Sequence, residues 1–344
     1  MRDDMAEQPK VKKTRRRLLL GAAKIVIAVV LLYLLLRGTQ RSDFRDALRA
    51  IQWPWFALAA FLHFPGYLIS AWRWRILLRA QGQQIPFWKL VESYIVATFF
   101  NYALLGTLGG DVIRLTDTGL GRKRGAQAAS SILVERLTGF IAMVLLAAIG
   151  VLLLALTGKT SSSMNAAVWG ALVLFALFCA GLIVLTHPQV ARRLAVLADK
   201  FMPFAGRLGH KLADALAVFH ADRRPVYANL AWALLLQVNV AAHYFCLGLA
   251  MGLPAVREAP LQHAFNYMVL VPLITLILTI PITPGGAGVR ELTLKELRRG
   301  LGIPATAAGV EQAYVLGWAQ VASVLLYGAA GFVIFIARLS RRKR

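Results

Sequence analysis

The chain has 344 residues, of which 58% are hydrophobic and 16% charged, and it carries a formal net charge of +23. Its mean hydropathy is +0.61 and its isoelectric point is near 10.9. Soluble domains are nearer half apolar, and several apolar runs here approach the roughly 20 residues that cross a bilayer. The composition therefore predicts an all-α polytopic membrane protein. It excludes a soluble nucleic-acid-binding protein, the class that so basic a charge would otherwise suggest.

The basic residues cluster beside apolar runs, which is typical of cytoplasmic loops that face anionic lipid headgroups. Cys179 and Cys246 both lie inside apolar runs, so no disulfide framework is expected. The sequence has no Cys/His spacing typical of a metal site and no GxxxxGK[ST] motif. We therefore expect no metal or other cofactor.

The first part of the chain predicts a tail, an anchor and a second helix. Residues 1–17 are polar and basic and are expected to form a cytoplasmic tail at the membrane surface. Residues 18–36 are too long for a signal-peptide core, so they predict a retained first helix with the N-terminus in the cytoplasm. A second helix is expected at 53–72, with tryptophans at both ends and a basic cytoplasmic exit that begins at Arg73.

The third apolar run begins near Phe87 and reaches an interruption at 101–114, which reads NYALLGTLGGDVIR. The segment after it carries Arg114 and a basic cluster that ends at Arg124, which indicates the cytoplasm. A complete crossing would place this segment outside. A re-entrant return between Phe99 and Gly110 resolves the conflict.

The remaining chain predicts helices at 130–156, 166–186 and 226–251, then a second interrupted run at 264–288. A last apolar region at 303–337 crosses once or twice, and a basic tail follows at 339–344. Residues 188–225 have apolar side chains every three or four positions. They predict one or two amphipathic helices in the cytoplasmic interface or, alternatively, a helix packed on transmembrane segments. In total we expect about seven to eight transmembrane helices in one domain, 18–338.

The second interruption, 275–292, reads TLILTIPITPGGAGVREL and cannot form an ordinary membrane helix. Pro281 and Pro284 each remove a backbone donor, and the glycines that follow permit a tight path. Such a break at membrane depth is tolerated where it is buried in protein or lines a wet cavity.

The two interruptions share a Gly-Gly-x-x-x-Arg pattern and so form an internal repeat. Gly109, Gly110 and Arg114 have the same spacing as Gly285, Gly286 and Arg290, with Asp111 and Glu291 close by. Corresponding breaks in two halves of a transporter indicate its binding site. The repeat predicts that two broken or re-entrant segments meet at a pore or lipid groove; a purely structural small-residue break is the alternative.

Arg114 and Arg290 are the candidates to bind a lipid phosphate, because guanidinium matches phosphate bidentately. The neighbouring glycine-rich backbone is expected to add N–H donors in a nest. Asp111, Glu135 and Glu291 would counter a cationic headgroup or pair with the arginines.

Glu135 and its neighbour Arg136 point about 100° apart on a helix, so each is expected to have its own partner or to snorkel to water. Asn101 completes the candidate site. His63, His243 and His263 are single in the sequence and are expected to be packed or interfacial rather than catalytic.

Four motifs resemble the transmembrane, flippase-like domain of the lysylphosphatidylglycerol synthase family. They are RWR at 73–75, Asn101 with GGDVIR at 109–114, VERL at 134–137, and PITPGGAGVRE at 281–291. The family often has proline where this chain has Gly106. The resemblance covers nearly the whole chain and implies a stand-alone bacterial inner-membrane protein without the synthetase domain, which moves a phospholipid, aminoacylated lipid, hopanoid or glycolipid between leaflets.

This function makes the protein a transporter rather than an enzyme, with membrane lipids as ligands and no nucleic acid. Lipid-synthesis enzymes and a second copy of the chain are possible partners. One alternative is a membrane-embedded transferase on a lipid-linked substrate, with Asp43, Asp46, Asp111 or Glu291 as its carboxylate. The other is a non-catalytic subunit of a lipid-synthesis complex.

Overall fold

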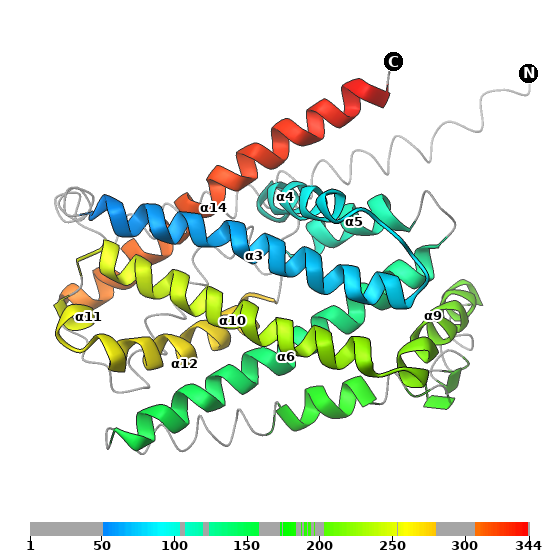
Figure 1. Ribbon diagram of the computed structural model, residues 1–344, viewed down its shortest axis with the longest axis horizontal. Coiled ribbons are helices and arrows are strands. Elements are labelled where there is room, and N and C mark those ends of the chain that lie inside the picture. The colour runs from blue at the N-terminus through cyan, green and yellow to red at the C-terminus, as the bar shows by residue number, and fades with distance from the viewer. Residues whose placement is uncertain are drawn as a thin grey trace, which may run out of the picture.

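The computed structural model describes residues 51–103, 107–119, 124–157, 203–252, 254–279 and 307–342, with scattered positions between 173 and 196. These residues form helices and short turns, without a strand among them (Figure 1). The helices are α3 (Trp53–Ala80), α4 (Phe87–Ala103), α5 (Thr107–Thr118), α6 (Gly125–Leu156), α9 (Pro203–Ala221), α10 (Arg224–Ala250), α11 (Pro254–Glu258), α12 (Pro260–Leu278) and α14 (Ala307–Arg342). The predicted all-α class is confirmed.

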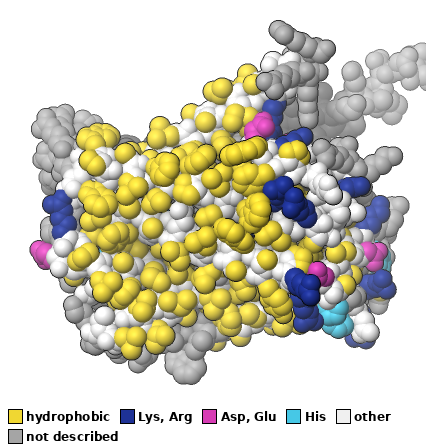
Figure 2. Space-filling view, viewed as in Figure 1, with side chains coloured by type: hydrophobic (Ala, Val, Ile, Leu, Met, Phe, Trp, Pro, Cys, Tyr) yellow, Lys and Arg dark blue, Asp and Glu magenta, His cyan; other side chains and the backbone are white. Residues whose placement is uncertain are grey.

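Five helical segments in the described part of the chain are long and apolar enough to cross a membrane. They are α3, α6, α10, α12 and the Ala319–Arg338 portion of α14. Figure 2 shows apolar side chains over the broad face of the bundle, with charged side chains gathered mainly at the end that carries α9. This distribution fits a bundle embedded in lipid. The total of seven to eight crossings stays a prediction.

Helix α3 is longer than the sequence indicated, because it continues eight residues beyond Trp72 to Ala80. Arg73 is 3% exposed, so the expected basic exit does not begin there. Its guanidinium finds acceptors on α6 and α10, which satisfies the charge inside the bundle and lets the helix continue.

Helices α3 and α10 run side by side along the long axis of the molecule, and α10 also contacts α6 and α12 (Figure 1). Helices α3, α10 and α12 share a hydrophobic core. It contains Tyr244 and Leu247 of α10, Leu270 and Ile274 of α12, and Ala59 of α3. Helix α10 thus provides the central contact surface of the bundle.

The first interrupted segment is a hairpin of two helices, because α4 and α5 pack against each other. With 12 residues, α5 is only about 18 Å long, which is too short to cross a hydrocarbon core of about 30 Å. Helix α4 ends at Ala103 and α5, which packs on it, begins at Thr107, so the change of direction falls within the interval expected from the sequence. A re-entrant position in the membrane remains a prediction.

Helix α9 uses its apolar stripe for packing. Leu216 and Phe219 are buried against Leu77 of α3, Val134 of α6 and Val226 of α10. Helix α9 thus packs on membrane-spanning candidates, as the second alternative for 188–225 predicted. The cytoplasmic-interface position of 188–225 stays a prediction.

The last apolar region forms one unbroken helix, α14, which packs on α4. Near its end, Arg338 donates from Nε to Glu92 of α4 at 2.6 Å and from Nη1 to Asp117 of α5 at 2.9 Å. Asp117 also accepts a 2.8 Å hydrogen bond from Ser93. The C-terminal part of α14 thereby holds both arms of the α4–α5 hairpin.

Several predictions lie outside the described residues. These are the tail 1–17, the helix 18–36, most of the helix 166–186, the basic end 343–344 and residues 280–292 of the second interruption. Gly285, Gly286, Arg290 and Glu291 belong to that interruption, so the meeting of the two repeats stays a prediction.

Glycine in α14 allows its close approach to α4. A Cβ at Gly331 would collide with the backbone carbonyl of Ile95, whereas a Cβ at Gly328, one turn earlier, finds Phe99 Cα at 4.0 Å. We expect Gly331→Ala to lower stability by about 2 kcal/mol, because the helices must separate. Gly328→Ala is the matched control and should leave stability unchanged or raise it by up to about 1 kcal/mol. Thermal unfolding of the purified variants in detergent measures both; equal melting temperatures would contradict the close contact.

Candidate functional site

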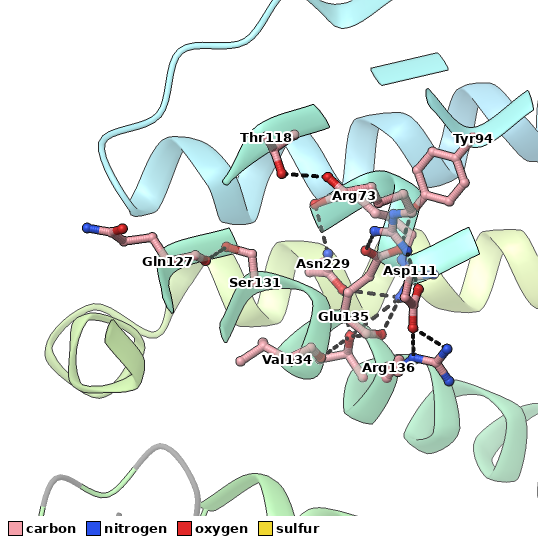
Figure 3. Close-up of polar contacts among 12 residues, drawn as sticks. Arg73, Tyr94, Asp111, Thr118, Gln127, Ser131, Val134, Glu135, Arg136 and Asn229 are labelled. Atoms are coloured by element: carbon pink, nitrogen blue, oxygen red, sulfur yellow. Dashed lines mark hydrogen bonds and ion pairs between the residues drawn. The ribbon is translucent and has the colours of Figure 1, made fainter. Parts of the chain in front are cut away.

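Glu135 is the centre of a buried cluster of charged and aromatic side chains from four helices (Figure 3). It projects from α6, a segment apolar enough to span a membrane, and is 7% exposed. Its carboxylate accepts from Tyr94 Oη of α4 and pairs with Arg114 Nη2 of α5. Both carboxylate oxygens therefore have a partner, as a buried charge requires.

Arg114 contacts two aromatic rings, which lie edge to face with centroids 5.8 Å apart, as well as the Glu135 carboxylate. Its guanidinium carbon lies 4.2 Å from the ring centroid of Trp74 and 4.3 Å from that of Tyr94. Aromatic faces attract a guanidinium, and more strongly when water is excluded. Arg114 is 6% exposed, so these contacts and Glu135 together stabilise its charge inside the bundle.

Asp111 joins a second arginine to the cluster. Arg136 donates from Nε to Asp111 Oδ2 at 2.7 Å and also pairs with that oxygen through Nη2. Arg114 Nη1 reaches the other oxygen, Oδ1, at 3.4 Å. The expectation that Glu135 and Arg136 have separate partners is therefore confirmed. Glu135 does not snorkel to water.

Arg73 packs behind the cluster through backbone and amide groups. Its Nη2 donates to the backbone oxygen of Glu135 at 3.1 Å and to Asn229 Oδ1 at 3.2 Å. Asn229 returns a 2.9 Å hydrogen bond to the Arg73 carbonyl, and Thr138 donates to Asn229 at 2.6 Å. This network joins α3, α6 and α10 around the turn of α6 that carries Glu135.

A cavity of about 320 Å³ lies in front of Arg114, between α3, α4, α5, α10 and α14. Leucine, valine, alanine and glycine form part of its wall, but many of the lining side chains are polar. Those that bear on its chemistry are Asn101, Asp111, Arg114, Asn239, His243 and Gln320. Three of the five helices that form it, α3, α10 and α14, include membrane-spanning candidates, so the cavity places polar and charged side chains within an apolar bundle.

The glycines of the first repeat contribute by packing. Gly109 and Gly110 lie within the helix α5, so the expected nest is not formed there. A Cβ at Gly109 would lie 2.6 Å from the Phe100 carbonyl oxygen, and one at Gly110 would lie 2.5 Å from Asn101 Oδ1. Instead of a ligand, Asn101 Oδ1 accepts the Gly110 N–H at 2.7 Å. The glycines allow α5 to approach α4, which places Arg114 against Tyr94.

The sequence prediction brought together Asn101, Asp111, Arg114, Glu135 and Arg136, and the structure places all five around the cavity or its supporting cluster. It missed the aromatic faces on Arg114, the Arg73–Asn229 network and the proximity of His63 to His243. Arg73 and Asn229 are polar positions within apolar runs, which was a usable signal. No sequence signal indicated that Trp74 and Tyr94 contact Arg114, because tryptophan and tyrosine are also ordinary membrane-interface residues.

The fold and the site define a polytopic α-helical membrane protein with a charge-lined cavity inside the bundle. The chain belongs to the family of the lysylphosphatidylglycerol synthase TM region, whose model matches residues 21–331. The resemblance seen in the sequence motifs is thereby confirmed, and it relates the protein to lipid modification or translocation in a membrane. A search of curated proteins found no match.

The buried pair predicts a large response to loss of one charge. Glu135→Gln leaves Arg114 facing an amide, so we expect stability to fall by about 3 kcal/mol. Adding Arg114→Met to Glu135→Gln should restore part of that loss, because the second change removes the uncompensated charge. Melting temperatures in detergent measure both variants. Arg192→Ala, which breaks the exposed pair with Asp214, is the control and should cost less than about 1 kcal/mol. A double variant less stable than the single one would contradict the coupling.

Proposed function

We propose that this protein translocates a lipid between the two leaflets of a bacterial inner membrane, with its N-terminus in the cytoplasm. The observation that carries the proposal is the polar, charge-lined cavity within the membrane-spanning bundle. Charged groups in such a bundle are costly and generally serve a substrate or ion pathway. Membership of a family concerned with lipid modification or translocation supports the same function.

The cavity suits a polar headgroup. Its volume of about 320 Å³ is at the lower end of the range of ligand sites, about 300–1,000 Å³. Acyl chains need no such chamber, since they can remain in the hydrocarbon region while the headgroup passes. In this proposal the protein moves the lipid without changing it covalently.

Arg114 is the group we expect to bind the headgroup phosphate. Glu135 and two aromatic rings hold it at the cavity wall, while its 3.4 Å contact with Asp111 is long for a hydrogen bond. Asp111 also has Arg136 as a partner. A phosphate oxygen can therefore replace Asp111 at Nη1 without leaving either charge unpaired. Within the described residues, Arg114 Nε is a further donor without a partner.

The proposal takes in the second repeat and the substrate classes that the family suggests. Arg290 would provide the matching phosphate contact, with the second glycine pair beside it. A phospholipid, an aminoacylated phospholipid, a hopanoid or a glycolipid has the required combination of polar head and apolar chains. Lipid-synthesis enzymes would supply the substrate from the cytoplasmic side.

Filling the cavity should stop transport. Ser70 lines the cavity from α3, so Ser70→Phe is expected to reduce translocation by about tenfold, because the headgroup loses its space. The assay is quenching of fluorescent phospholipid by dithionite in proteoliposomes. Leu58→Phe, at an outward position on the same helix that is 41% exposed, is the control and should retain the wild-type rate.

Two results would overturn this function. One is a wild-type rate no greater than that of empty vesicles for each of the four lipid classes. The other is a wild-type rate for Ser70→Phe in a sample with a normal melting temperature. Covalent modification of the lipid by the purified protein alone would instead support the transferase alternative.

A further inference from the structure

Two histidines from different helices lie against each other on the cavity wall. His63 belongs to α3 and His243 to α10, and their ring centroids are 4.3 Å apart with an interplanar angle of 51°. Both line the cavity, and His243 is only 3% exposed. Neither histidine takes part in the Arg114–Glu135 cluster described above.

Two hydrogen-bond contacts of His243 place oxygen atoms beside its ring. Its Nδ1 lies 2.7 Å from the backbone oxygen of Ala59, and its Nε2 contacts Gln320 Oε1. A neutral imidazole has a single N–H, whereas an imidazolium has two. A protonated His243 can donate to both oxygens, whereas a neutral His243 that donates to Ala59 needs the Gln320 amide turned so that its NH₂ faces Nε2.

The contact of His63 with Ser323, by contrast, needs only one N–H group, which a neutral imidazole has. Ser323 Oγ donates its proton to the backbone oxygen of Gln320 at 2.8 Å, so it can only accept from His63. His63 Nε2 lies 3.1 Å from that Oγ and thus carries the N–H. A second proton on His63 would place two positive charges in adjacent rings, which is unfavourable in a buried site. A single proton added to the pair is therefore expected on His243.

Few of the described groups can compete for this proton. Two tyrosine rings contact the pair: that of Tyr244, with its centroid 5.5 Å from that of His243, and that of Tyr327, at 5.7 Å from His63. Among the described residues that line the cavity, Asp111 is the sole carboxylate, and it already binds Arg114 and Arg136. Tyrosines are neutral near pH 7 and Asp111 is engaged, so the histidine pair is the group of the described wall that can gain a proton there.

We infer that the His63–His243 pair is a binding site for a single proton and that proton release turns the Gln320 side chain. When His243 loses its Nε2 proton to cavity water, that nitrogen becomes an acceptor, and Gln320 must present its amide NH₂ in place of Oε1. Gln320 lines the cavity from α14. Each protonation state thus gives the cavity wall a different hydrogen-bonding surface. On the basis of the proposed function, this switch couples lipid movement to a proton gradient.

Histidine-labelled protein in lipid nanodiscs tests the proton site directly. In nitrogen NMR over about pH 5 to pH 8, the range where histidine titrates, the His243 signals should pass from two N–H groups to one. His243→Asn should remove this transition, and Gln320→Leu should shift it toward lower pH because an acceptor for the imidazolium is lost. His263→Asn, on α12 and outside the cavity lining, is the control and should leave the transition unchanged. A His243 that stays neutral throughout, or two rings that titrate independently, would overturn the inference.

Proteoliposomes with an internal pH dye test the coupling. An imposed pH gradient should change the wild-type translocation rate by about tenfold, and His243→Asn should abolish that response, since the ring that gains the proton is removed. An unchanged gradient response in His243→Asn would remove the coupling while leaving the transport function intact. If the wild type moves no lipid at all but the NMR transition appears, the transport proposal fails and the proton site stands.

Discussion

The carboxylate of Glu135 is the constraint on which the rest of the structure depends. A charge buried within an apolar helix must be paired and hydrogen-bonded, and Glu135 obtains its partners from α4 and α5. The backbone of the same residue receives Arg73 of α3, whose guanidinium also bonds to Asn229 of α10. One α6 residue therefore contacts three neighbouring helices directly and is linked to α10 through Arg73. The cavity is the space that these helices leave in front of Arg114.

The α4–α5 hairpin links this cluster to the end of the molecule. Its glycines bring the two short arms together, and Arg338 of α14 joins Glu92 on one arm to Asp117 on the other. Arg114 and Asp111 lie on the same short helix, α5. A shift of this helix would change both the cavity wall and its ion pairs at once. Gln320 of α14, His243 of α10 and His63 of α3 form another part of the wall. The proposed phosphate and proton sites thus occupy separate parts of one cavity.

Charged and glycine residues within apolar runs allowed much of the site to be predicted. Asp111, Arg114, Glu135 and Arg136 were expected to interact because isolated charges at membrane depth need partners. The helix angle of about 100° between Glu135 and Arg136 predicted separate partners, and this is confirmed. The prediction that Gly109 and Gly110 form a nest of N–H donors was wrong, since both are packing positions inside a helix. Glycine permits both a tight turn and a close helix contact, and the local sequence does not distinguish between them.

The sequence by itself determined the class of the protein: its hydropathy requires a bilayer, and a bilayer requires helices whose backbone groups are satisfied internally. It also determined the family, through motifs that follow one another along the chain. Only the tertiary structure decided that Arg73 is buried, that Arg114 packs against two aromatic rings, and that His63 meets His243. The two histidines are separated by 180 residues, counting from 63 to 243. Their contact depends on the packing of α3 on α10, which no local periodicity encodes.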